Sequence, residues 1–85
     1  MNIKVLYFAR IKEAVNYSTE EITLPNEIFT ITALKNYLAQ RGEVWANLFN
    51  GKQNIRAAIN HELVADVAVI KAGDEVAFFP PVTGG

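Results

Sequence analysis

The stretch GDEVAFFPPVTGG, residues 73–85, decides how the rest of the chain must be arranged. Its first part, Glu75 to Phe79, is largely apolar, which predicts a central strand of a sheet. Pro80 and Pro81 lack the backbone N–H that a strand or helix needs, and two consecutive prolines favour a stiff extended segment. The strand must therefore stop before the prolines, and we expect the residues after it to project as a tail.

The tail ends in Gly84-Gly85, which carry no side chain. One interpretation is a functional end, because a diglycine without side chains lets a terminal carboxylate pass through a narrow opening in another protein. The simpler interpretation is a frayed end or a leftover linker. We favour a functional, flexible tail, because several features follow the apolar strand directly. These are the two prolines that stop the strand, the short residues Val82 and Thr83, and a terminal carboxylate without neighbouring side chains. The expected organisation is one domain over residues 1–79 and an extended tail over residues 80–85.

Composition narrows the class of protein. The chain has 85 residues, 51% of them apolar, which is enough for one domain with a single core. Cysteine is absent from the sequence, so disulfides and thiolate metal sites are excluded. The net charge is −1, with acids and bases interspersed, which predicts neither a nucleic-acid nor a membrane partner. The apolar run near the start is too short for a signal peptide or a membrane span, and we expect a cytoplasmic protein.

Hydrophobic periodicity predicts the remaining elements. We expect a main helix that begins at Thr30 or Thr32 and stops at Gly42, followed by a shorter helical turn whose core face is Trp45, Leu48 and Phe49. A short turn or helical piece is expected at residues 13–16, and a connecting turn at residues 65–70. Strands are expected at residues 3–8, 20–24, 55–59, 62–64 and 75–79, the first of them covered on both faces.

This order of elements is typical of a β-grasp, or ubiquitin-like, fold of the α+β class. The first two strands form a hairpin, the helix follows, a second hairpin turns at Asn60-His61, and one more strand ends the domain. We expect a mixed sheet in which the first and last strands lie side by side in parallel at the middle. The main helix then packs across one face.

The body of the chain offers little chemistry of its own. Nucleophilic catalysis usually combines a serine or cysteine with a histidine, and here the single serine, Ser18, and the single histidine, His61, give only an accidental pair. His61 lies beside no cluster that predicts a metal site, and no metal is expected. Asp74 and Glu75 could act as a pair of carboxylates. A Gly-Asp turn that leads into a strand explains Asp74 more simply.

The remaining reactive group is the α-carboxylate of Gly85. This group is ionised at neutral pH and is a poor electrophile, so it needs activation from outside. An acyl-adenylate made from ATP would supply that activation. Attack by a sulfur donor would then give a thiocarboxylate, which needs no cysteine from this chain.

Three segments carry a resemblance to a known family: KVLYFAR at residues 4–10, Ala58-Ile59-Asn60, and GDEVAFFPPVTGG at residues 73–85. They resemble the small subunits of molybdopterin synthase, the MoaD type of ubiquitin-like sulfur carrier in the MoaD/ThiS family. The likeness spans the whole length, although residues 38–54 contribute little to it. The ending is its most specific part, because the thiamin-pathway carriers share the Gly-Gly but generally lack the Phe-Phe-Pro-Pro approach.

The resemblance implies a sulfur-carrier subunit that is not an enzyme on its own. Gly85 would be adenylated by an E1-like enzyme, which uses the ATP, and converted to a thiocarboxylate with sulfur from a donor protein. The tail would then enter the active site of a large subunit and give its sulfur to cyclic pyranopterin monophosphate. The family assembles as two small and two large subunits, and the small subunit binds no cofactor.

The resemblance also implies that Phe8 and Phe79 dock these partners, with Arg10 and Lys12 nearby. Core packing is the alternative role for the two phenylalanines, since a strand exposes one side chain in two. Three other functions stay open: a carrier for thiamin or another sulfur-transfer pathway, a ubiquitin-like modifier that forms isopeptide bonds to lysines, and a binding module whose tail is inert.

Overall fold

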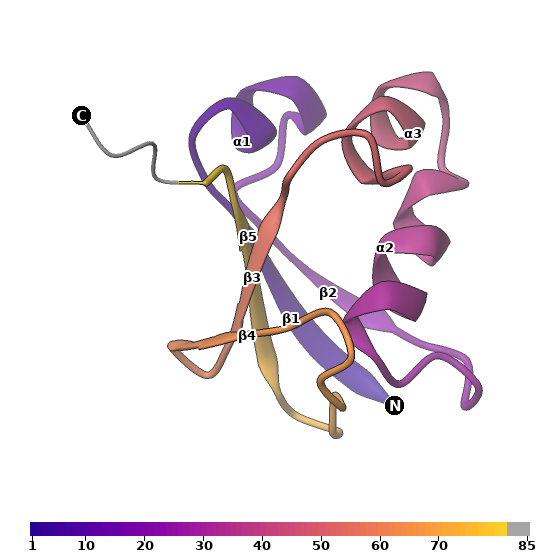
Figure 1. Ribbon diagram of the computed structural model, residues 1–85. Helices are drawn as coiled ribbons and strands as arrows, with labels where there is room; N and C mark the ends of the chain where they lie inside the picture. The colour runs from indigo at the N-terminus through magenta and orange to yellow at the C-terminus, as the bar shows by residue number, and fades with distance from the viewer. Residues whose placement is uncertain (82–85) are drawn as a thin grey trace.

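The computed structural model describes residues 1–81, which form five strands and three helices (Figure 1). Strands β4 and β5 have the bounds expected from the sequence, and the other strands differ from the expected bounds by at most one residue at each end. The elements in chain order are β1 (Asn2–Tyr7), α1 (Ala9–Val15), β2 (Thr19–Thr23), α2 (Ile31–Ala39), α3 (Glu43–Phe49), β3 (Arg56–Ile59), β4 (Glu62–Val64) and β5 (Glu75–Phe79).

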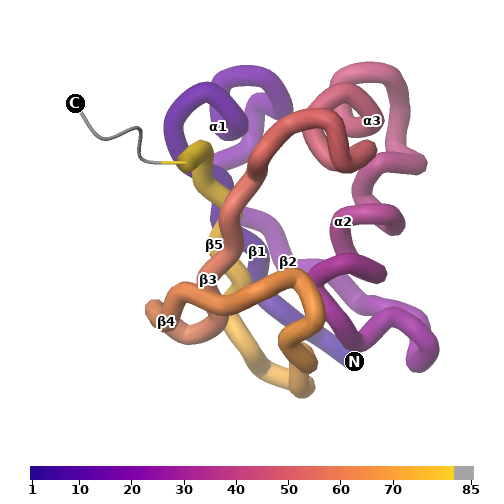
Figure 2. Tube along the Cα trace, in the orientation of Figure 1, coloured from indigo at the N-terminus to yellow at the C-terminus, as the bar shows by residue number. Residues whose placement is uncertain are grey.

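The strands form one mixed sheet with the order β2-β1-β5-β3-β4. β1 and β5 pair in parallel, with Val5 opposite Val76, while the other neighbours pair antiparallel. The sequence-based prediction of a β-grasp fold with the first and last strands adjacent at the middle is therefore confirmed. The trace in Figure 2 shows α2 and α3 on one side of this central pair and α1 near the end of the two strands.

Alternate side chains of the central strands build the core. Ile3, Val5 and Tyr7 of β1 are buried, and so are Val76 and Phe78 of β5. Successive strand residues point to opposite faces, so these side chains share one face of the sheet. Helices α2 and α3 cover that face with a second set of buried residues, namely Ile31, Leu34, Leu38, Leu48 and Phe49.

The expectation that the first strand is covered on both faces is wrong. Leu6 of β1 and Ala77 of β5 are only partly buried, and Lys4 is exposed. The helical connection crosses the sheet on one side, and residues 1–81 supply no further layer for the other side. We call this uncovered side the open face; its strand residues include Lys4, Leu6, Arg56, Ala58, Leu63, Glu75, Ala77 and Phe79.

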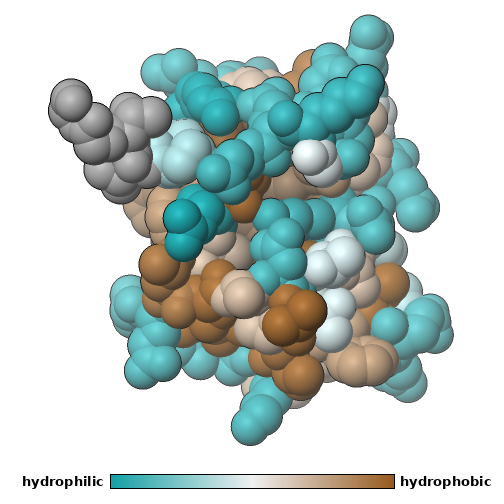
Figure 3. Space-filling model, viewed as in Figure 1, coloured by the Kyte–Doolittle hydropathy of each residue, from teal (hydrophilic) through white to brown (hydrophobic). Residues whose placement is uncertain are grey.

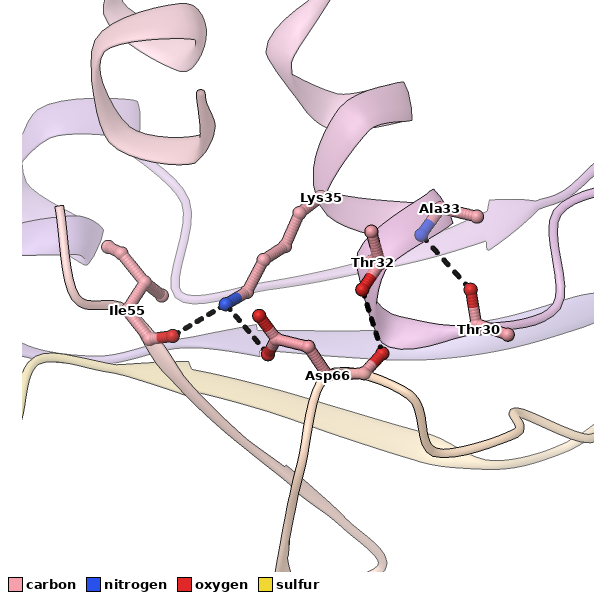
Figure 4. Close-up of polar contacts among 6 residues, drawn as sticks. All are labelled: Thr30, Thr32, Ala33, Lys35, Ile55 and Asp66. Carbon is pink, nitrogen blue, oxygen red and sulfur yellow. Dashed lines mark hydrogen bonds and ion pairs between the residues drawn. The ribbon is translucent and has the colours of Figure 1, made fainter. Parts of the chain in front are cut away.

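Local capping explains where the helices begin and end. Of the two expected caps, Thr30 is the one that begins α2, because its hydroxyl accepts a hydrogen bond from the backbone N–H of Ala33 at 3.1 Å (Figure 4). Thr32 instead donates its hydroxyl to the carbonyl of Asp66 at 3.0 Å. Gly42 does not stop α2, which ends at Ala39; it lies at the N-cap of α3 with φ 149°.

An aromatic and polar cluster joins the sheet to α3. The Tyr7 hydroxyl donates to Glu20 Oε2 at 2.6 Å, and Arg41 pairs with the same oxygen at 2.7 Å. The rings of Tyr7 and Trp45 meet edge to face at 5.7 Å between centroids, which confirms the expected core face of α3. Burial, together with the hydrogen bond to Glu20 and the charge of Glu20, raises the pKa of Tyr7 well above its ordinary value.

Candidate functional site

The candidate site lies where β5 ends. Phe79 is the last residue of β5 and stands opposite Arg56 of β3, and Pro80 and Pro81 follow it as a half-buried extended segment. We call Phe79, Pro80 and Pro81 the tail base. Figure 1 places the tail base at the margin of the molecule, beside α1. The tail residues Val82, Thr83, Gly84 and Gly85 lie outside the described residues.

Phe8 is held beside the tail base by backbone contacts from both sides. Its N–H donates to the carbonyl of Phe78 at 3.1 Å, and its carbonyl accepts from the N–H of Ile11 at 3.2 Å at the start of α1. Ala9 follows with φ 54°, a left-handed conformation that is uncommon for a residue with a Cβ. This abrupt turn lets the chain leave β1 for α1 at once, and it leaves the Phe8 side chain 47% exposed.

The two phenylalanines therefore differ in burial. Core packing does not describe Phe8, which is nearly half exposed, while Phe79 is half-buried on the open face. Arg10 is exposed on α1, where its guanidinium Nη1 donates to the side-chain carbonyl of Gln53. Lys12 is exposed on the same helix. The sequence-predicted contact residues Phe8, Arg10 and Phe79 are thus all accessible around the end of β5.

An apolar row that the sequence analysis missed crosses the open face. Leu6, Ala77, Ala58 and Leu63 are successive register partners on β1, β5, β3 and β4. Leu63, at the outer end of the row, is 59% exposed, an uncommon amount for a leucine. These residues are aligned only by the pairing register of the strands. The alternation of Ile3, Val5 and Tyr7 with Lys4, Leu6 and Phe8 could have indicated that Leu6 lies on the face opposite to the core.

Further exposed apolar side chains follow β4 in the chain. Val67 and Val69, in the connection between β4 and β5, are both exposed. Figure 3 shows the resulting hydrophobic surface over β4 and the segment that follows it. Contiguous exposed apolar surface on a small protein typically marks a site of interaction with another molecule.

Charges are distributed unevenly along β5. Arg56 lies opposite Phe79 at its end, and Arg10 lies in α1, two residues after Phe8. At its start, Asp74 accepts hydrogen bonds from the Lys71 N–H at 2.8 Å and from the Asn60 side chain at 3.0 Å, as a turn residue does. His61 is exposed in the neighbouring turn, 3.7 Å from Glu75, at the far end of β5 from the tail base. Neither Asp74 nor His61 belongs to the candidate site.

Residues 1–81 contain no group of three or more His, Cys, Asp or Glu side chains that could hold a metal ion. In the same part of the chain, no helix combines the length and apolarity needed to cross a membrane. The side chains around the tail base are apolar or basic, so their arrangement suits contact with another protein.

Comparison with known proteins gives closely related sequences. The chain is 41% identical to the molybdopterin synthase sulfur carrier subunit of Haemophilus influenzae over 83 residues, covering 98% of this chain and 99% of that protein. It is 43% identical to the protein of the same name from Escherichia coli over 84 residues, with 98% and 99% covered.

Solved structures share the fold. A putative molybdopterin converting factor subunit 1 from Pyrococcus furiosus has a TM-score of 0.78 and 27% identity, covering 96% of this chain and 99% of that one. The complex of subunits 1 and 2 of the molybdopterin-converting factor from Helicobacter pylori contains a chain with a TM-score of 0.67 and 24% identity, both chains being covered completely.

The model of the ThiS family matches residues 5–85, which include the central strands, α2 and the tail. This match spans nearly the whole chain, and the bacterial relatives at 41% and 43% identity agree with it. The chain therefore belongs to the ThiS family.

Proposed function

We propose that this protein is the sulfur carrier subunit of a molybdopterin synthase. One observation carries the proposal: the open face presents an apolar surface that leads, along β5 and the tail base, directly to a terminal diglycine. The names of the Haemophilus influenzae and Escherichia coli relatives support the same role. The protein acts as a donor within an enzyme complex and has no catalytic activity by itself.

The chemistry takes place at the α-carboxylate of Gly85. An E1-like enzyme binds ATP and joins this carboxylate to AMP, with release of pyrophosphate. A sulfur donor protein then supplies sulfur at the oxidation level of sulfide, which attacks the acyl carbon, displaces AMP and leaves a thiocarboxylate. The thiocarboxylate sulfur attacks a carbon of cyclic pyranopterin monophosphate and displaces an oxygen substituent there. Water then cleaves the resulting thioester, which leaves the sulfur on the pterin and restores the carboxylate. This chain holds no cofactor during these steps, because the activating enzyme holds the ATP.

The residues of this chain bind and orient. Phe8, Phe79 and Leu63 supply accessible apolar area, and Pro80 and Pro81, which lack a backbone N–H, end the strand before the tail. Gly84 and Gly85 offer no side chain to obstruct a narrow channel. Binding at the open face would thus help to hold the reacting atom, at the end of the tail, in the required position.

The principal partner is the large subunit of the synthase, and the Helicobacter pylori complex of subunits 1 and 2 supports a partner of that kind. Arg10 and Arg56 would form part of the polar rim around the apolar contact. The activating enzyme and the sulfur donor need access to the same tail, so they bind the carrier in turn.

Moving the carboxylate tests this proposal. One alanine appended after Gly85 shifts the carboxylate by about 3.5 Å, and a misplacement on the order of 1 Å can cost a hundredfold in rate. The extended protein should fold and dock but should not be adenylated or transfer sulfur. Gly84→Val should act similarly through added bulk, while Thr83→Ser, which keeps the length of the tail, should stay active.

The assay is reconstituted conversion of the pterin precursor with the activating enzyme, ATP and sulfide. Near-normal product from the alanine-extended protein would refute the carboxylate mechanism, because the chain has no cysteine to carry sulfur instead. Intact-protein mass spectrometry separates the rival functions. Replacement of one oxygen by sulfur in the free protein supports a carrier, whereas covalent conjugates to other proteins in denaturing gels support a modifier.

A further inference from the structure

A polar cleft opens on the helix-covered side of β3, away from the open face. It lies between α2, the segment of residues 50–55 and the end of β4, and its volume is about 440 Å³. This volume is within the range of roughly 300–1,000 Å³ found for small-molecule sites. Figure 3 shows mainly hydrophilic side chains over the region between β3 and α2.

Lys35 of α2 is fixed at the wall of this cleft. Its side chain is only 13% exposed, and its ammonium donates to the carbonyl of Ile55 at 2.6 Å and to Asp66 Oδ1 at 3.0 Å (Figure 4). A lysine ammonium has three N–H donors, so these two contacts leave one donor for a ligand. The position of that donor is set in advance, because both protein contacts hold the ammonium.

The cleft is a positively charged region of a protein whose net charge is −1. Arg56 also borders the cleft, but its register position opposite Phe79 places its side chain on the open face. The other charged lining residues are Lys35, Lys52 and Asp66, which gives two cations and one anion, or a formal charge of +1. Within residues 1–81, Lys52 takes part in no salt bridge. The side-chain amides of Asn36 and Asn54 add neutral hydrogen-bond donors to the lining.

We propose that this cleft binds the phosphate group of a small molecule. A phosphate monoester carries a charge of about −1.5 to −2 at pH 7, which is opposite in sign to the formal charge of the cleft. Lysine donors together with amides are groups that satisfy its oxygens. The volume leaves room for an organic portion beside the phosphate, over the apolar floor formed by Leu48, Phe49 and Val64.

The test is a titration of the ¹⁵N-labelled protein, followed by amide chemical shifts at constant ionic strength. The probes are inorganic phosphate, adenosine monophosphate, adenosine and sodium chloride. Saturable shifts confined to residues 35–36, 50–56 and 65–66 are expected with both phosphates. Equal affinity for the two indicates a site for free phosphate, and tighter binding of the nucleotide indicates a phosphate ester.

A matched pair of variants distinguishes the cleft from general charge. Lys52→Gln should weaken phosphate binding about two- to fivefold, the effect of one partly exposed charge. Lys71→Gln removes an exposed lysine outside the cleft lining and should leave the affinity unchanged. The proposal fails if both variants weaken binding equally, if chloride reproduces the shifts, or if adenosine alone moves the same amides.

Discussion

Replacing Leu34 with alanine would remove a side chain that is 0% exposed in the middle of α2. Loss of its buried methyl and methylene groups costs about 2.4 kcal/mol in transfer free energy, at about 0.8 kcal/mol each. The cavity left behind raises the expected loss to about 2.7–5 kcal/mol. A domain of this length typically has an unfolding free energy of about 4–13 kcal/mol, so Leu34→Ala should remove a large part of the stability.

Leu63→Ala is the matched control, because it makes the same chemical change at a side chain that is 59% exposed. Denaturant unfolding followed by circular dichroism should give a change below about 0.5 kcal/mol for Leu63→Ala. Leu34→Ala should lower the melting temperature by at least about 10 °C, since 1 kcal/mol corresponds to roughly 4–8 °C. Equal stability of the two variants would refute the assignment of Leu34 to the core face of α2. In binding assays with the large subunit, only Leu63→Ala should weaken the complex.

Three other predictions concern the tail and Tyr7. Deleting residues 83–85 should leave the melting temperature almost unchanged, because glycine-rich ends bury little apolar area; a large decrease would show that the tail is structural. Phe79→Asp should weaken binding to the large subunit strongly by placing a carboxylate in a desolvated contact, and added salt should weaken it far less; dissociation by salt alone would contradict this. Because burial raises the pKa of Tyr7 above its unfolded value, the stability that its neutral hydroxyl contributes should persist below about pH 10 and decrease as the pH rises beyond it. In unfolding experiments at different pH values, Tyr7→Phe should abolish that decrease. An unchanged dependence of the unfolding free energy on pH in this variant would contradict the role of the Tyr7 hydroxyl.

The central part of the fold was predictable because its signals are local. The apolar run before Pro80-Pro81 fixes where β5 ends, and the periodicity from Ile31 to Leu38 identifies α2. Helix α1 was only partly predicted, since it begins at Ala9 after a left-handed turn that alanine does not signal. The prediction that both faces of β1 are covered was wrong, because a continuous apolar run does not show whether a second layer packs on the sheet.

The site was predictable only in part. Resemblance to a family pointed to Phe8, Arg10 and Phe79, and the structure shows that all three are accessible. The apolar row from Leu6 to Leu63 depends on register across four strands, which no local pattern encodes. The cleft was likewise not predictable, because Lys35 reaches acceptors 20 and 31 residues away in sequence.

The place of β5 between β1 and β3 also determines how the protein responds to mechanical force. A pull on the chain beyond Pro81 acts along the strand, whereas the ladder hydrogen bonds run across it on both sides. Such a load shears two ladders together, while a load on the edge strand β4 opens a single ladder one bond at a time. A load applied beyond Pro81 should therefore meet more resistance from the sheet than an equal load applied to β4.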